Sequence, residues 1–101
     1  MTAKKTVVSL DPHEIRELKN QLHNLKPAII IENDGLTDTV IQEIDNALTD
    51  NELIKVRTHA TTSEELVTIA EEICSKTKAA LIQTIGYIVA IYRKNPQVEE
   101  Q

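Results

Sequence analysis

Residues 26–36 have the sequence pattern of a segment that could hold a phosphate group. The segment opens with Lys26 and a proline, continues as a short apolar run, and breaks into a polar turn that ends at Gly35. A helical pattern follows at once, and the backbone amides at a helix N-terminus bind anions. The carboxylates of Glu32 and Asp34 lie in the same turn, where a phosphate would have to approach. Phosphate binding and a simple turn before a helix are therefore both open interpretations of this loop.

A set of cationic side chains offers a second kind of phosphate contact. Four of them recur at helical spacing and so share one flank of a predicted first helix: Arg16, Lys19, His23 and Lys26. Two more, Lys55 and Arg57, alternate with apolar residues in a later predicted strand. Cations arranged in this way can neutralise successive phosphates of a nucleic acid. A solvated helix surface is the alternative, because Glu14 and Glu17 dilute the positive charge.

The residue pattern for catalysis or metal binding is weak. His13, His23 and His59 fall on separate predicted elements and lack metal-ligand spacing, and no P-loop, nucleophile-elbow or dinucleotide motif occurs. The single Cys74 falls on the apolar face of a predicted helix, where a thiol is usually an inert small hydrophobe. We therefore expect no enzymatic activity, no cofactor, no metal and no small-molecule substrate.

Composition narrows the class of protein. A chain of 101 residues suits one domain, and with two Tyr but no Trp or Phe its core must be aliphatic. The net charge of −5 argues mildly against nucleic-acid binding, although a local basic face can coexist with an acidic remainder. One cysteine, no leader-like segment and no membrane-length apolar run predict a soluble cytoplasmic protein without a membrane partner. We expect a monomer, and the sequence shows no exposed heptad or long apolar edge.

The order of predicted elements indicates an α/β fold. Asp11 and Pro12 begin a helix that continues until Pro27, and the β-branched run at 28–31 predicts a buried strand. Two further helices begin near residues 37 and 61, and three strands occupy residues 53–57, 79–85 and 87–92. Asp45 in the second helix is expected to face solvent. The order α-β-α-β-α-β-β predicts a two-layer sandwich with helices packed on a four-stranded mixed sheet.

Several sequence segments resemble a known family. They run in order along the chain: Leu10 with Pro12, HNLKP at 23–27, GLT at 35–37, EIDNAL at 43–48, ELIKVR at 52–57, IG at 85–86 and YR at 92–93. These segments resemble the CRM domain family, typified by the small bacterial YhbY proteins. The resemblance implies the fold of the C-terminal domain of bacterial translation initiation factor three. It covers a CRM domain at 10–94. The residues outside it predict a flexible arm at 1–9 and, from its charges and proline, a tail at 95–101.

The resemblance further implies RNA binding. Family members associate with RNA through a GxxG loop between the first strand and second helix, together with basic residues of the first helix. Here the loop corresponds to residues 32–35: Gly35 keeps the second glycine, Glu32 replaces the first, and Asn33 stands where a basic residue is usual. The bacterial single-domain members are linked to precursors of the large ribosomal subunit.

We therefore predict an RNA-binding protein that assists assembly of the large ribosomal subunit, with ribosomal RNA or a pre-50S particle as its partner. The predicted RNA-binding residues are Arg16, Lys19, His23, Lys26, Asn33, Gly35, Lys55 and Arg57. The alternative is a protein-interaction module that keeps the CRM fold but has weakened or lost RNA binding. The acidic balance of the chain and the presence of Glu32 in the loop favour this alternative.

Overall fold

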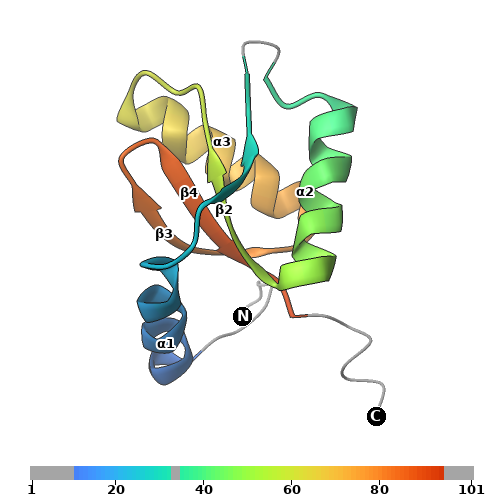
Figure 1. Ribbon diagram of the computed structural model, residues 1–101. Coiled ribbons are helices and arrows are strands. Elements are labelled where there is room, and N and C mark those ends of the chain that lie inside the picture. The colour runs from blue at the N-terminus through green and yellow to red at the C-terminus, as the bar shows by residue number, and fades with distance from the viewer. Residues whose placement is uncertain (1–10, 33–34, 95–101) are drawn as a thin grey trace, which may run out of the picture.

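The computed structural model of the protein describes residues 11–32 and 35–94 (Figure 1). Its elements are α1 (Pro12–Leu22), β1 (Pro27–Ile30), α2 (Asp38–Asn51), β2 (Leu53–Arg57), α3 (Ser63–Thr77), β3 (Ala80–Ile85) and β4 (Ile88–Tyr92). The predicted element order is confirmed. The predicted arm at 1–9 and tail at 95–101 lie outside the described residues, as do Asn33 and Asp34 of the loop.

The four strands form one mixed sheet in the order β1-β2-β4-β3. β1 runs parallel to β2, and α2 provides the crossover that a parallel connection needs. β4 pairs antiparallel with both β2 and β3. The turn between β3 and β4 begins at Gly86, whose φ of 60° matches the glycine of a type II′ hairpin turn.

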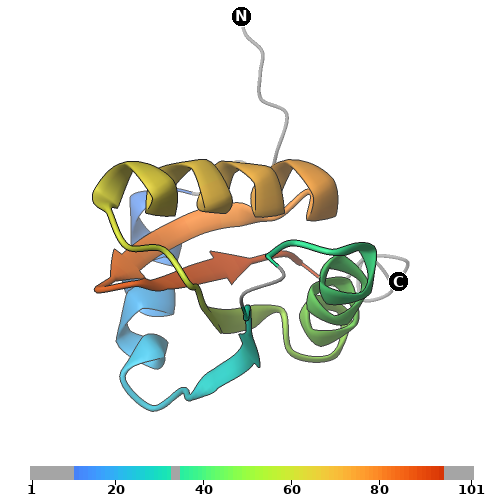
Figure 2. The ribbon, with the colours of Figure 1, turned by 90° about the horizontal axis from the view of Figure 1, so that it is seen from above.

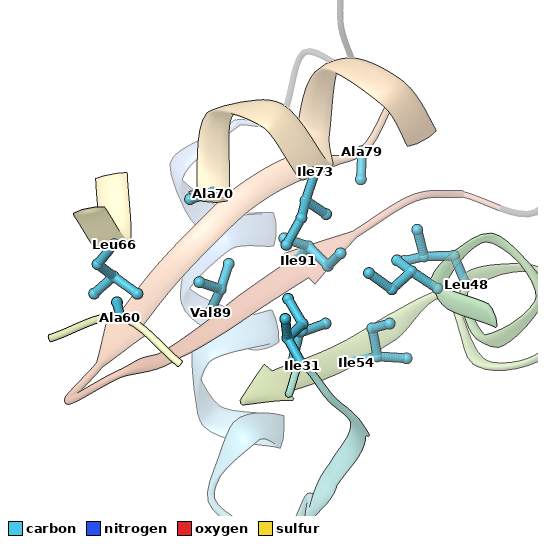
Figure 3. Packing of buried hydrophobic residues seen from close by; sticks show 12 residues of the cluster. Ile31, Leu48, Ile54, Ala60, Leu66, Ala70, Ile73, Ala79, Val89 and Ile91 are labelled. Carbon is cyan, nitrogen blue, oxygen red and sulfur yellow. The ribbon is translucent and has the colours of Figure 1, made fainter. Parts of the chain in front are cut away.

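The helices lie on both faces of this sheet. Ile54 and Val56 of β2 pack in the main core beneath α2 and α3 (Figure 3). Leu53 of β2 and Ala90 of β4 point the opposite way and pack against Leu22 of α1 in a second cluster. Figure 1 shows α1 below the strands and α3 above them, and in Figure 2 α3 runs alongside β3. The α/β fold with helices packed on a four-stranded mixed sheet is confirmed, with α2 and α3 on one face of the sheet and α1 on the other.

The core is aliphatic, as the composition predicts. Its largest fully buried side chains are Ile44, Leu48, Ile73, Ile91, Val56, Val89 and Thr77. The one polar member, Thr77, donates its hydroxyl to the carbonyl of Ile73 at 2.7 Å, so no hydrogen-bonding capacity of that O–H is lost on burial.

Side-chain caps determine where the helices begin. The carboxylate of Asp11 accepts from the amide of Glu14 at 2.8 Å, and Glu14 accepts in return from the amide of Asp11 at 3.3 Å. This capping box fixes the start of α1. Thr37 caps α2 by accepting from the amide of Val40 at 3.2 Å, and Thr62 caps α3 in the same way. Each cap satisfies an amide that the helix itself cannot pair.

Three local expectations are corrected. α1 ends at Leu22 instead of continuing to the proline, and the amide of Leu25 donates to the carbonyl of Leu22 at 3.1 Å in a tight turn. The residue before a proline avoids the helical region, so the helix could not have continued through Lys26. β1 is not buried, because it forms an edge of the sheet and the side chain of Ile30 is 56% exposed. Asp45 does not simply face solvent, because its carboxylate binds Arg93 at 2.6 Å.

Candidate nucleic-acid interface

The loop after β1 starts directly beside the end of β2. The amide of Ile31 donates to the carbonyl of Arg57 at 2.8 Å, which extends the β1–β2 pairing by one step. The amide of Gly35 donates to the carbonyl of Glu32 at 2.9 Å. Gly35 has a φ of 77°, a region that glycine adopts without the steric cost that a Cβ would bring. Gly35 therefore has a conformational role in the loop, whatever the loop binds.

His59 lies beside this loop. A Cβ built on Gly35 would stand 3.9 Å from Cε1 of the His59 ring. His59 also lines a shallow surface hollow at the start of α3 together with Thr62 and Glu65. Hydrogen bonds from Thr61 hold the pKa of the Glu65 carboxyl below its ordinary value, and the nearby charge of His59 acts in the same direction.

No functional role was predicted for His59. His59 follows β2 and Gly35 follows β1, and these two strands are parallel neighbours. The carboxyl ends of parallel neighbours meet at one edge of a sheet, so residues just beyond them come together. The parallel pairing of β1 with β2 is the fact that the sequence pattern alone did not supply.

α1 carries charges of opposite sign on its two flanks. The basic flank consists of three exposed side chains: Arg16, Lys19 and His23. On the other flank, Glu14 and Glu17 line a surface hollow of about 150 Å³ with His13 and Tyr92. Nε2 of His13 lies 3.9 Å from the carboxylate of Glu17, an ion pair when the imidazole is protonated. The more buried side chains of α1, those of Ile15, Leu18 and Leu22, lie between the two flanks. The acidic side chains therefore do not interrupt the basic flank.

Lys26 lies beyond the end of α1. Since α1 ends at Leu22, Lys26 follows the helix and immediately precedes β1. It is exposed and lines a separate hollow of about 280 Å³ with Gln21 and Asn51. Of the four cations in the expected stripe, Arg16 and Lys19 therefore lie on α1, His23 is its C-cap residue, and Lys26 lies beyond the helix.

Lys55 and Arg57 differ in their surroundings. The ammonium group of Lys55 is half-buried and donates to the carbonyl of Leu25 at 2.9 Å. This bond ties the segment between α1 and β1 to the middle of β2. Arg57 is exposed at the end of β2 and forms no ion pair with any residue of the described ranges. Of the two cations, Arg57 is the one whose charge is open to an external anion.

The predicted site residues fall into two groups at opposite ends of β1. α1 and Lys26 precede the strand, and the loop with Gly35 follows it (Figure 1). Arg57 belongs to the second group because its carbonyl pairs with Ile31 at the start of the loop. A ligand that contacts both groups must therefore extend along the length of β1, as a nucleic-acid backbone can.

The described residues were compared with three kinds of feature: a metal-binding group, a reactive thiol and a membrane-spanning helix. In residues 11–32 and 35–94, no three His, Cys, Asp or Glu side chains are grouped to hold a metal ion. Burial raises the pKa of the Cys74 thiol to about 11, so the thiol is protonated at neutral pH and is a poor nucleophile. No helix of the described chain combines the length and apolar character needed to cross a membrane.

Known proteins share both the sequence and the fold. The family model of the CRS1 / YhbY (CRM) domain matches residues 10–93. An RNA-binding protein of Haemophilus influenzae is 37% identical over 95 residues, which cover 94% of this chain and 96% of the relative. A probable RNA-binding protein of Pseudomonas aeruginosa is 34% identical over 90 residues, covering 89% of this chain and 86% of the relative.

A solved structure is similar over most of its length. The solution structure of a hypothetical protein of Staphylococcus aureus matches with a TM-score of 0.75 and 31% identity, covering 85% of this chain and 90% of that one. The two chains therefore share this fold over most of their lengths. The chain belongs to the CRS1 / YhbY (CRM) domain family.

Proposed function

We propose that this protein binds structured RNA without catalysing a reaction, and that it assists assembly of the large ribosomal subunit in the cytoplasm. The similar proteins of Haemophilus influenzae and Pseudomonas aeruginosa are named for RNA binding, which supports the class of ligand. The observation that carries the proposal is the set of unpaired surface cations. Arg16, Lys19 and Arg57 are exposed and take part in no ion pair within the described chain, although the net charge is −5.

Contacts to the RNA backbone form at both ends of β1. At one end, Arg16, Lys19, His23 and Lys26 neutralise phosphates, and each neutralised phosphate adds salt dependence to the affinity. At the other end, Arg57 and Gly35 approach the RNA beside the start of α2, and Asn33 takes part as the family's loop pattern implies. The hydroxyl of Thr37 already accepts from the amide of Val40. The other amides of the first turn of α2 are the ones left to bind a phosphate of the RNA. Lys55 takes part by holding the α1–β1 connection in place.

Sedimentation with ribosomal particles tests this proposal directly. The protein should co-sediment with large-subunit precursors at low salt and dissociate as salt is added, because counterion release drives binding to phosphates. The mature small subunit serves as the control particle. A protein that stays in the unbound fraction at low salt, even when the precursors are in excess, would contradict the proposed function.

A protein-interaction module is the second candidate. The acidic flank of α1, where Glu14 and Glu17 line a hollow with Tyr92, offers a surface that a basic protein segment fits. If neither the wild type nor Glu32→Gly binds ribosomal RNA at low salt, this second candidate replaces the first.

A further inference from the structure

Four residues form a line across the whole sheet at the end where β2 stops. Ile30 of β1 pairs with Arg57 of β2, Arg57 pairs with Ile88 of β4, and Ile88 pairs with Ile85 of β3. Paired residues of neighbouring strands point to the same face. The preceding pair of β1 and β2, Ile29 with Val56, packs in the core beneath α2 and α3, so this line points to the opposite face.

α1 covers that face only in part. The side chains packed against α1 come from Leu53, Ile82 and Ala90, and none of the isoleucines of the line belongs to this cluster. The side chains of Ile30 and Ile85 are 56% and 39% exposed. Solvent therefore reaches β-branched side chains on both sides of Arg57, and exposed apolar side chains that adjoin one another can form a binding surface.

Tyr87 extends the line at the hairpin turn. It follows Gly86 between β3 and β4, and its side chain is 51% exposed. The carbonyl of Tyr87 accepts from both the amide and the hydroxyl of Thr58, at 2.9 and 2.7 Å. Thr58 is itself buried and directly follows Arg57. An aromatic residue is thus exposed on a turn whose backbone is anchored to the end of β2.

The charge on this sheet has one sign. The four strands contain two charged residues, Lys55 and Arg57, and both are cations on the face toward α1. Glu32 is the first acidic residue after β1. An exposed aliphatic and aromatic surface with a central guanidinium is complementary to a flat, apolar ring system linked to an anion, which is the chemistry of a nucleotide.

We propose that Ile30, Arg57, Ile88, Ile85 and Tyr87 form a platform for unpaired RNA bases. The inference rests on the proposed RNA binding and adds a ligand class to it: single-stranded segments next to the duplex that the phosphate contacts hold. Bases stack on Tyr87 and on the Arg57 guanidinium, and the isoleucines cover the base faces. The two hydrogen bonds from Thr58 hold the backbone of Tyr87 in place before RNA arrives, which lowers the backbone entropy lost on binding.

Single-stranded and duplex RNA separate this platform from the phosphate contacts. Fluorescence anisotropy with labelled oligoadenylate and with a blunt RNA duplex would be measured for wild type, Tyr87→Ala, Ile30→Ser and Val67→Ser. Val67 on α3 is the matched control, because it is an apolar side chain 51% exposed on the other face. Tyr87→Ala and Ile30→Ser should each weaken oligoadenylate binding by about fivefold or more and leave duplex binding unchanged. Circular dichroism confirms that each variant is folded.

Each outcome decides the proposal. Oligoadenylate binding that is equal in wild type, Tyr87→Ala and Ile30→Ser overturns the platform. A wild type that binds the duplex but not oligoadenylate also overturns it and leaves the proposed function standing. A wild type that binds neither RNA overturns both. If the wild type self-associates and Tyr87→Ala abolishes this, the face binds a second copy of the chain. That outcome would also overturn the platform.

Discussion

The guanidinium of Arg93 donates to the carboxylate of Asp45 at 2.6 Å, joining the chain just after β4 to the middle of α2. The same guanidinium donates to the carbonyl of Thr77 at 2.8 Å and to the hydroxyl of Thr49 at 2.9 Å. The backbone amide of Arg93 donates to the carbonyl of Glu52 at 2.8 Å. One side chain therefore holds α2, the end of α3 and the end of the sheet together.

Arg93→Ala should destabilise the fold. The side chain is 17% exposed, and hydrogen bonds that involve a charged group contribute about 1.5–3 kcal/mol each. Because the bonds act as one network, we expect the free energy of unfolding to fall by about 2–3 kcal/mol in total. Urea denaturation measures this change. Arg16→Ala is the matched control and should change stability by less than about 0.5 kcal/mol; equal losses in the two variants would contradict a special role for Arg93.

Removing the basic flank of α1 should weaken RNA binding without affecting the fold. The double variant Arg16→Gln, Lys19→Gln removes two exposed cations that form no ion pair in the described structure. The slope of log affinity against log salt should become shallower by about 1–2 in magnitude, because two fewer phosphates are neutralised. Titrations at several salt concentrations measure this slope. The control is the double variant Glu14→Gln, Glu17→Gln on the acidic flank, which should leave the salt slope unchanged. A shallower slope in the control alone would contradict RNA contact with the basic flank of α1.

Glu32→Gly should tighten RNA binding. Glu32 stands at the first position of the GxxG-type loop, and two like charges ~4 Å apart repel by about 4 kcal/mol at an effective dielectric of ~20. Solvent and salt reduce this repulsion at an exposed site. We therefore expect Glu32→Gly to raise RNA affinity by about tenfold at low salt. Glu32→Gln separates charge from shape and should recover most of the gain. Glu71→Gln on α3 is the control, and equal effects at both positions would show only a general change in net charge.

Stability should depend on pH through Cys74. Burial raises the thiol pKa from 9.0 to about 11, so the folded state binds the thiol proton more tightly than the unfolded state does. The resulting stabilisation is fully present below pH 9 and is lost as the pH rises toward 11. Urea midpoints measured across this range should fall more steeply for wild type than for Cys74→Ala. Parallel pH profiles for the two proteins would show that the thiol does not titrate in this way.

Local sequence features were sufficient to predict the elements. Helix starts follow from short-range chemistry, as the capping box of Asp11 with Glu14 and the threonine cap of α2 show. The aliphatic core follows from composition. The end of α1 differs from the prediction: helical periodicity continues past Leu22, but the helix ends there and a tight turn leads to β1.

The candidate site was predictable only in part. Arg16, Lys19 and Arg57 are exposed as a binding role requires, and Gly35 has the positive φ that its place in the loop requires. Lys55 was chosen for its charge, but its ammonium group binds the carbonyl of Leu25. Charge and alternation are local properties, whereas the partner of a side chain depends on which distant segment packs beside it.

The sequence by itself determined the helices, the strands, their order and the family resemblance, because caps, periodicity and turn residues act over a few positions. Tertiary structure decided which face of the sheet each helix covers. An amphipathic pattern states that one side of α1 is buried but not which face of the sheet buries it. The pairing of β1 with β2 then brought His59 beside Gly35, and the placement of α1 left Ile30 and Ile85 exposed on either side of Arg57. These neighbours come from distant parts of the chain, so only the packed fold could bring them together.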